Sequence, residues 1–322
     1  MNTIKNYIKQ NNWVWAGFGA FLLWFVMGIS SGRLNAESFI SNAYTASFLA
    51  ILAFGQMLVI TSGRGAIDLS IPGVLTLMAF VSMSIINGIS ANVPLALLVV
   101  ILLSAIIGLL NSVMVIYLKI PTIIATMAMN YILTTATLLI NRKFAIFTIA
   151  PILQAMTRGR VLGIPLMIYF VLLIAVLIGL VLNKTSYGKS LLAIGQNYEA
   201  AKLAGVKVVK IEMITYCLSS VFAGLSGILI SARVGGALLG MGDAYTMETV
   251  ASVVVGGTLI SGGDASVPGT LAGCLFLGLI VTAMQILGMS VGAQKIAKGL
   301  IVLFVVLIGT FQCNSSVKEK KC

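Results

Sequence analysis

Long apolar runs recur along almost the whole chain, and they limit the folds that it can adopt. A helix needs about 20 mostly apolar residues to cross the hydrocarbon core of a bilayer. Ten windows approach that description: residues 14–30, 43–61, 68–86, 93–117, 121–141, 164–182, 211–232, 246–260, 268–288 and 294–311. The sequence therefore predicts an all-α polytopic membrane protein with about ten transmembrane helices, forming a single domain over residues 1–322.

Composition supports a membrane protein and excludes several other classes. The chain is 59% apolar and only 9% charged, so polar surface could not cover it in water. Its 20 basic residues outnumber its 8 acidic ones, but they lie in short loops and tails without interleaved aromatic residues, which is not a nucleic-acid-binding pattern. Four cysteines lack metal-type spacing and there is no histidine, so we expect no metal and no cofactor of its own.

The distribution of basic residues predicts the orientation in the membrane. Lys5 and Lys9 precede the first apolar run, which has no small-residue cleavage site and is expected to remain as a helix. With the amino terminus inside, twelve of the 20 basic residues fall on the inner side. This arrangement places residues 1–12, 183–210 and 312–322 in the cytoplasm.

One outer segment, residues 141–163, runs against this bias because it carries four basic residues. It is long enough for a small surface helix at residues 152–158. Two interpretations stay open at even weight: a basic surface that docks an acidic external partner, or a solvated loop with no partner.

Residues 183–210 are the one persistently polar stretch between long apolar runs. Their pattern predicts a short amphipathic helix, Asn197–Ala204, closed by Gly205 and suited to a groove on a soluble partner. The tripeptide Gly188-Lys189-Ser190 is similar to the end of a phosphate-binding loop. That loop needs a glycine where this chain has Asn183, so we expect that the chain itself does not bind ATP.

A short motif occurs twice, at residues 62–73 and 261–269, each time as a break followed by a helix start. Asp or Ser can cap the first free amides, Pro suits the first helical turn, and Gly allows the backbone to bend. We therefore expect interrupted or re-entrant segments here. A gate on a transport path and a purely structural turn are both open, with candidate residues Asp68, Ser70, Asp264 and Ser266.

Candidate residues for a transport path must offer hydrogen bonds without charge. The acids near predicted span ends are Asp68, Asp243, Glu248 and Asp264, but span centres carry almost no charge, which weakens an ion-coupled carrier. Uncharged polar residues suited to a small polar solute are Gln56, Asn111, Thr126, Asn130 and Thr134. For each of them, a hydrogen bond between helices is the favoured alternative.

Several tracts together carry a family resemblance: residues 65–70, 120–127, 188–206, and 253–258 continuing into 261–263. Because these tracts occur together and in this order, the chain resembles the permease subunits of bacterial ribose-type ABC importers over nearly its full length. The resemblance implies an inner-membrane protein with both termini cytoplasmic, which imports a small polar solute, a monosaccharide, by alternating access. Two rivals remain: a secondary carrier or facilitator that works without an ATPase, and a receptor or scaffold that transports nothing.

The resemblance also implies partners and a coupling element. Two permease subunits, identical or different, would form the path, two cytoplasmic ABC ATPase subunits would use ATP and Mg²⁺, and an extracytoplasmic sugar-binding protein would deliver substrate. The chain would then be a transport subunit and not an enzyme. Residues in the position of the family's cytoplasmic coupling helix are Gly195, Asn197, Glu199, Ala200, Ala201 and Gly205.

Overall fold

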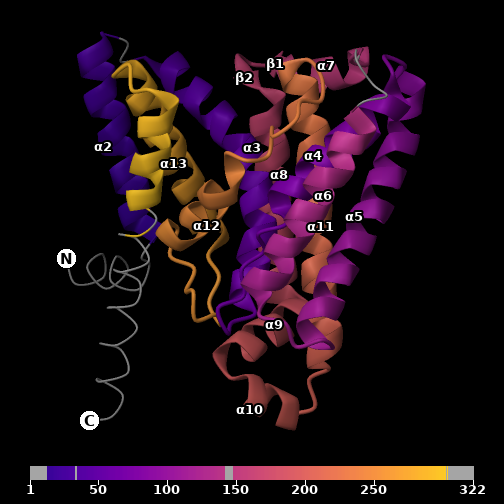
Figure 1. Cartoon of the computed structure of the whole chain (residues 1–322). Helices are drawn as coiled ribbons and strands as arrows, with labels where there is room; N and C mark the ends of the chain where they lie inside the picture. Colours follow the sequence, from indigo (N-terminus) through magenta and orange to yellow (C-terminus); the bar gives the residue numbers. More distant parts are fainter. Residues whose placement is uncertain (1–12, 33–34, 142–147, 302, 304–322) are drawn as a thin grey trace, which may run out of the picture.

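The computed structural model describes residues 13–32, 35–141, 148–301 and 303, and helices account for most of them. The helices stand side by side as a bundle, with α9 and α10 at one end and α7 at the other (Figure 1). Their bounds are α2 Trp13–Ser31, α3 Ala36–Thr61, α4 Ile71–Ile86, η1 Ser90–Asn92, α5 Val93–Ile116, α6 Thr122–Asn141, α7 Pro151–Arg158, α8 Leu166–Lys184, α9 Ser186–Gln196, α10 Tyr198–Leu203, α11 Val208–Val234, α12 Tyr245–Val255 and α13 Val267–Ile286. Residues 291–301 are also helical.

A small antiparallel hairpin accompanies α7, and the prediction of an all-α chain omitted it. Strands β1 (Arg160–Val161) and β2 (Ile164–Pro165) pair across a two-residue turn. Both turn residues, Leu162 and Gly163, have positive φ, at 53° and 80°. Two-residue hairpin turns require this conformation because its twist matches that of the strands.

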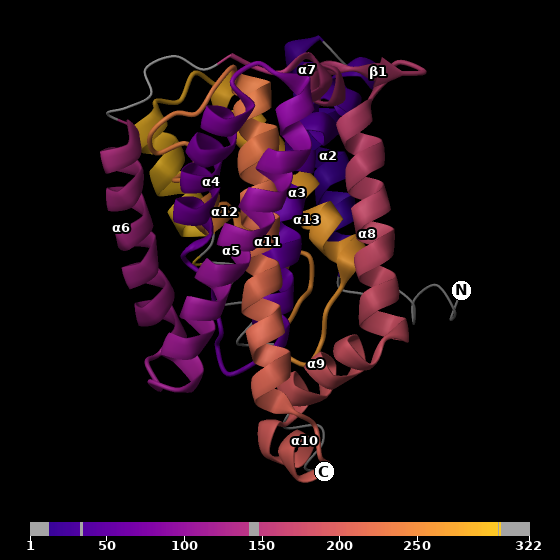
Figure 2. The same ribbon diagram turned by 90° about the vertical axis from the view of Figure 1, so that its right-hand side faces the viewer.

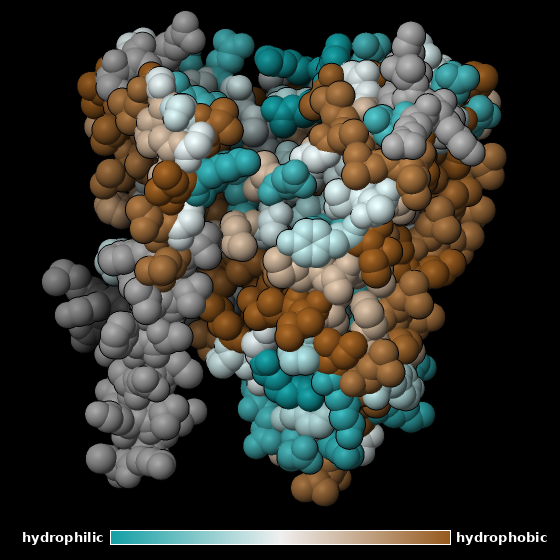
Figure 3. Space-filling model, viewed as in Figure 1, coloured by the Kyte–Doolittle hydropathy of each residue, from teal (hydrophilic) through white to brown (hydrophobic). Residues whose placement is uncertain are grey.

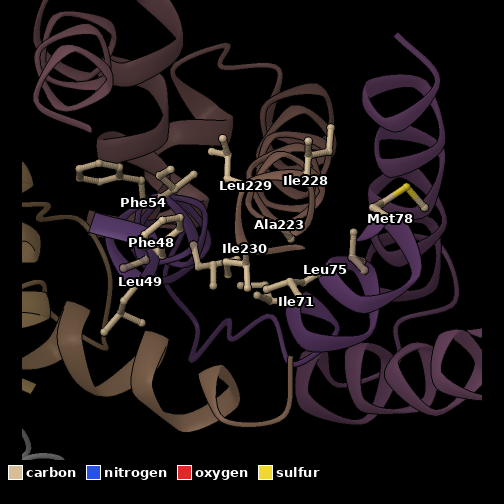
Figure 4. Close-up of a cluster of buried hydrophobic side chains, with 14 of the residues drawn as sticks. Phe48, Leu49, Phe54, Ile71, Leu75, Met78, Ala223, Ile228, Leu229 and Ile230 are labelled. Carbon is tan, nitrogen blue, oxygen red and sulfur yellow. The ribbon is translucent and has the colours of Figure 1, made fainter. Parts of the chain in front are cut away.

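Helix α11 is the centre of the bundle and packs against α3, α4 and α5. It runs along the bundle with α6 and α8 on opposite sides (Figure 2). The core formed with α3 and α4 is apolar (Figure 4), and its drawn members include Phe48, Phe54, Leu75 and Ile228, each at most 1% exposed. A second packing unit joins α13 to α2, α3 and α12. The molecule thus has a dense centre and a flanking α2–α13 pair.

Burial separates central helices from peripheral ones. The most apolar 18-residue window of α3 is 83% buried, whereas those of α5, α6 and α8 are 33%, 28% and 28% buried. The outer faces of these three helices expose large apolar side chains such as Leu102, Ile132 and Leu173. An exposed apolar surface of this extent matches contact with lipid.

Helix ends follow local sequence signals. Asn35 caps α3 by accepting a hydrogen bond from Ser38 N at 2.8 Å, and proline stands in the first turn of α4, α5, α7 and α13. Gly235 ends α11 with φ of 103°, a left-handed conformation that glycine adopts without steric cost.

Six helical stretches are long and apolar enough to cross a membrane, and they confirm six of the predicted windows: Ala36–Thr61, Ser90–Ile116, Thr122–Asn141, Leu166–Lys184, Val208–Val234 and Val267–Ile286. Three shorter apolar stretches are Val14–Ile29 within α2, Ile71–Ile86 (α4) and Tyr245–Val255 (α12). Within the described residues, the bundle is therefore a polytopic one with six candidate spans, and the predicted count of ten is not confirmed.

Two predicted windows need correction. The window 68–86 begins with irregular chain, because the first break continues to Ser70 and α4 starts only at Ile71. The window 246–260 is wrong as a span, because α12 has 11 residues and ends at Gly256. A helix of that length rises only about 16 Å, half the apolar thickness of about 30 Å. Of the window 294–311, residues 302 and 304–311 lie outside the described residues.

Candidate functional site

The polar stretch at residues 183–210 folds into two short helices that protrude from one end of the bundle. Thr185 caps α9 by accepting from Gly188 N at 3.2 Å, and Asn197 caps α10 by accepting from Ala200 N at 3.0 Å. Gly205, with φ of 83°, follows the C-cap of α10. The predicted helix is therefore present, with Asn197 as its N-cap and Leu203 as its last residue.

We call the two helices α9 and α10, with the residue that joins them, the α9–α10 loop. It has one face toward solvent and one toward the bundle. Glu199 and Ala200 are exposed, and Leu203 is 89% exposed at the far end. Ala201 is buried with Ile194 and Val208 in a small apolar cluster under the loop. Of the predicted coupling residues, Glu199 and Ala200 thus face outward, whereas Ala201 holds the loop in place.

Hydrogen bonding further anchors α9 to α11. The Tyr187 hydroxyl lies 2.9 Å from Thr215 Oγ1. Burial raises the pKa of Tyr187 to about 12, so this hydroxyl stays uncharged at neutral pH.

The end of α9 touches both breaks through backbone atoms. A Cβ on Gly195 would lie 2.0 Å from the Thr61 carbonyl oxygen and 2.2 Å from the Gly263 nitrogen, so only glycine fits. Gly263 N donates to Thr61 O at 3.0 Å, and Gln196 Nε2 donates to Gly263 O at 3.3 Å. We call this meeting of three segments at Thr61, Gly63, Gly195, Gln196 and Gly263 the triple contact. Segments about 200 residues apart in the sequence therefore meet at the base of the α9–α10 loop.

The first break, residues 62–70, is locked by a buried carboxylate. Asp68 Oδ1 accepts hydrogen bonds from Ser70 N at 2.9 Å and Ser70 Oγ at 2.6 Å. Its Oδ2 accepts from Ser219 Oγ of α11 at 2.7 Å, and Asn111 Nδ2 of α5 donates to Ser70 Oγ at 2.8 Å. Asp68, Ser70, Ser219 and Asn111 are each at most 2% exposed. Buried charge is costly unless it is hydrogen-bonded, and here both oxygens have partners.

Two further predicted path residues hold the backbone of this break. With its amide nitrogen facing the Asp68 carbonyl, Gln56 donates to Asp68 O at 3.0 Å and accepts from Asp68 N at 3.2 Å. Thr126 Oγ1 accepts from Leu69 N at 3.0 Å and lies 2.8 Å from Thr122 O. Their hydrogen-bonding groups are thus used within the protein.

The remaining candidates on α6 lie apart from this cluster. Asn130 is half-buried, and its Oδ1 has no hydrogen-bond partner in the described part of the chain. Thr134 is exposed and donates to Asn130 O at 2.8 Å. The structure therefore brings together Gln56, Asp68, Ser70, Asn111 and Thr126, and leaves Asn130 and Thr134 outside.

The second break, residues 256–266, is held differently. Ser266 caps α13 by accepting from Gly269 N at 3.1 Å, and Thr258 Oγ1 accepts from Ser266 N at 3.4 Å. Gly269 packs against Gly256, where an added Cβ would lie 1.9 Å from the Gly256 carbonyl oxygen. Asp264 is exposed. The predicted capping role is confirmed for Ser266, whereas Ser70 makes no side-chain cap and Asp264 does not match Asp68.

Sequence reasoning missed the ionic link between the first break and the α9–α10 loop. Arg64, at φ of 58°, pairs with Glu212 at the start of α11. Its guanidinium also lies 4.1 Å from the ring centroid of Tyr198, the first residue of α10. All three residues line a cavity of about 650 Å³. The available signal was an arginine inside a repeated break motif, in a chain with few charges.

A larger cavity, of about 790 Å³, lies between α3, α12, α13 and the helical residues 291–301, and no motif in the sequence pointed to it. Glu248, noted only as an acid near a span end, lines it and pairs with Lys298. None of the predicted path residues lines this cavity. Among the described residues, no group of His, Cys, Asp and Glu could hold a metal ion.

Comparison with known proteins gives consistent matches. The family model described as branched-chain amino acid transport system / permease component matches residues 38–311. The ribose import permease protein RbsC of Escherichia coli (strain K12) is 32% identical over 264 residues, covering 80% of this chain and 81% of the relative. RbsC of Bacillus subtilis (strain 168) is 31% identical over 299 residues, covering 90% and 91%.

A relative with another named substrate matches less of the chain. The L-arabinose transport system permease protein AraH of Escherichia coli (strain K12) is 28% identical over 202 residues, covering 63% and 62%. No solved structure matches. The family model spans most of the chain, including both breaks and the α9–α10 loop. The chain therefore belongs to the branched-chain amino acid transport system / permease component family, and it is a permease subunit of a transporter.

Proposed function

We propose that this chain is the membrane-spanning permease subunit of an ATP-driven importer, and that the importer carries a monosaccharide across the bacterial inner membrane by alternating access. Its relatives named for ribose and for L-arabinose support a sugar as the substrate. The family description names branched-chain amino acids, which are zwitterions. The experiment below therefore compares a sugar with an amino acid.

The observation that carries the proposal is the triple contact. The α9–α10 loop projects from the bundle with Glu199 and Ala200 exposed, while its base touches both breaks through Gly195 and Gln196. A partner that moves α10 would therefore move the chain on either side of both interruptions. We propose that α10 is the coupling helix and that Asn197 and Gly205 define its two ends.

Assembly follows from this assignment. We propose that the importer has two cytoplasmic ABC ATPase subunits, which bind the ATP and Mg²⁺, and that one of them docks on α10. A second permease subunit, identical or different, completes the path and receives the other ATPase. The α9–α10 end would then be cytoplasmic, in keeping with the basic residues Lys184, Lys189, Lys202, Lys207 and Lys210 there, and both termini would lie on that side.

The opposite end carries α7 and the β1–β2 hairpin and would face the outside (Figure 1). Arg158 and Arg160 are exposed on it. Exposed cations suit an acidic surface on a partner, so we propose that the sugar-binding protein docks there.

The test reconstitutes the chain with its ATPase, second permease and binding protein in proteoliposomes. Uptake of D-ribose, L-arabinose and L-leucine is measured with and without ATP. The proposal predicts ATP-dependent sugar uptake that is absent from liposomes holding this chain alone. Uptake by the chain alone without ATP would show a facilitator instead, and no transport under any condition would show a receptor or scaffold.

The coupling assignment has its own variant, Glu199→Arg combined with Ala200→Trp. We expect sugar uptake to fall at least tenfold, because the changed face no longer fits the partner groove, while the subunit remains inserted and folded. A matched control changes the same positions conservatively, Glu199→Gln with Ala200→Ser, and should retain uptake. Unchanged uptake by the well-expressed Arg–Trp variant would contradict the assignment.

A further inference from the structure

The cavity of about 790 Å³ lies within the bundle, in a hollow on the face seen in Figure 3. Hydrophilic side chains gather in this hollow, whereas the flanks of the same face are mostly hydrophobic. The cavity is lined from α3, Arg233 of α11, the chain leading into α12, α12 itself, α13 and residues 291–299. Its volume falls in the range of about 300–1,000 Å³ that is usual for small-molecule sites.

Charged side chains inside the lining are already engaged. Glu248 pairs with Lys298, and both side chains are largely buried. The Arg233 guanidinium lies 5.0 Å from the Tyr44 ring centroid and 4.7 Å from that of Phe48, and donates to Thr45 Oγ1 at 3.2 Å. Lys298 is therefore neutralised by Glu248, whereas Arg233 keeps its charge and lies against two aromatic rings.

Uncharged hydrogen-bonding groups in the lining are available. Among the described residues, the hydroxyl of Tyr245 and the amide of Gln285 have no hydrogen-bond partner, while Thr282 Oγ1 is engaged with Asn42 Oδ1 at 2.8 Å. Tyr245 adds a half-buried ring, and apolar wall comes from Leu49, Met247 and Val281. Asp243 and Lys295 are exposed members of the lining and carry opposite charges.

We infer that this cavity is where the subunit contacts a neutral polyhydroxylated solute during transport. A sugar offers hydroxyls that match the free donors and acceptors of Tyr245 and Gln285, and an apolar ring face that can lie on an aromatic side chain. The buried Glu248 of the lining is neutralised by Lys298, so it is not free to bind the ammonium group of a zwitterionic amino acid, and the remaining carboxylate, Asp243, is exposed to solvent, where attraction between charges is weak. The inference rests on the proposed function for the direction of transport, but its site differs from the residues around Asp68.

The test uses the whole reconstituted importer and two variants, Tyr245→Phe and Gln285→Leu. The probe is whichever of D-ribose, D-xylose and L-arabinose the unaltered importer takes up fastest. Each variant should lower the initial uptake rate at low sugar concentration about threefold to tenfold, the usual effect of one lost hydrogen bond. ATP hydrolysis should be unchanged, because the α9–α10 loop is untouched.

Tyr131→Phe is the matched control, since Tyr131 is an exposed tyrosine on α6 that does not line the cavity. Unchanged uptake in both cavity variants would overturn the site, and uptake of L-leucine but of no sugar would overturn the solute class. Failure of the proposed function is distinguishable, because it appears as ATP-independent uptake in the unaltered importer. A variant that folds poorly is recognised by its elution profile in detergent and replaced by Tyr245→Leu or Gln285→Ala.

Discussion

The two breaks share a sequence motif but are stabilised in opposite ways. In the first, Asp68 is buried and gathers hydroxyl donors from Ser70 and from Ser219 of α11. In the second, Asp264 is exposed, and close glycine packing with the Ser266 cap holds the chain. The same motif is therefore held by side-chain hydrogen bonds in the first break and mainly by backbone packing in the second. We expect the second break to be the one that moves more readily.

The largest effect is expected where the two breaks meet. Gly195→Ala would place a Cβ 2.0 Å from the Thr61 carbonyl oxygen, so both breaks would have to shift. Overpacking of this kind costs about 1–3 kcal/mol or more, and sugar uptake should fall at least tenfold. Gly179→Ala on α8 is the control, because no heavy atom lies within 4 Å of its added Cβ. Equal uptake in both variants would contradict the role of the triple contact.

Removing the aspartate side chain from each break tests the comparison directly. Asp68→Ala leaves the Ser70 amide and the hydroxyls of Ser70 and Ser219 without their buried acceptor, at a cost of about 2–3 kcal/mol. Asp264→Ala should change stability by less than about 0.5 kcal/mol, because that carboxylate is exposed. Thermal unfolding in detergent measures both variants. Similar shifts in midpoint would show that the first break is not locked by its carboxylate.

A smaller effect is expected from the cap of the second break. Ser266→Ala removes the side-chain acceptor for Gly269 N and should destabilise α13 by about 1 kcal/mol. Ser266→Asp keeps an acceptor at the same position and should restore most of the midpoint. If the alanine variant unfolds at the unaltered temperature, the glycine packing alone holds this break.

The smallest effects should come from the side chains that tie each break to the α9–α10 loop. Arg64→Met loses the ion pair with Glu212 and the contact with the Tyr198 ring, about 1 kcal/mol together, since Arg64 is half exposed. Gln196→Met loses one hydrogen bond of 3.3 Å to Gly263 O, worth about 0.5 kcal/mol. We expect ATP-driven uptake to fall more for Arg64→Met. The reverse order would indicate that the second break carries the coupling.

Helix positions were predictable where one apolar run makes one helix. The windows for α5 and α6 agree with the structure within one residue at each end, because proline and polar residues mark their bounds. The window 246–260 failed because the residues after α12 are as apolar as those in it. An average of hydropathy therefore continues past the turn at Gly256 and Gly257, where the helix ends. Averaged hydropathy cannot distinguish a buried connection from a span.

The candidate site was predictable only in part. The α9–α10 loop was found because its polarity and its caps are local features. The partner of Asp68, Ser219, is 151 residues away, and no spacing rule could place it there. The large cavity draws its lining from residues 45 to 299, so it exists only in three dimensions.

The triple contact has a mechanical consequence that follows from its three glycines. At Gly63, Gly195 and Gly263, the touching atoms belong to the main chain, which has no rotamers to change under load. A side-chain contact can relax when the side chain changes rotamer, whereas the glycines of the triple contact have no side chain that could do so. Displacement of α9 would therefore reach both breaks nearly undiminished and at the same moment.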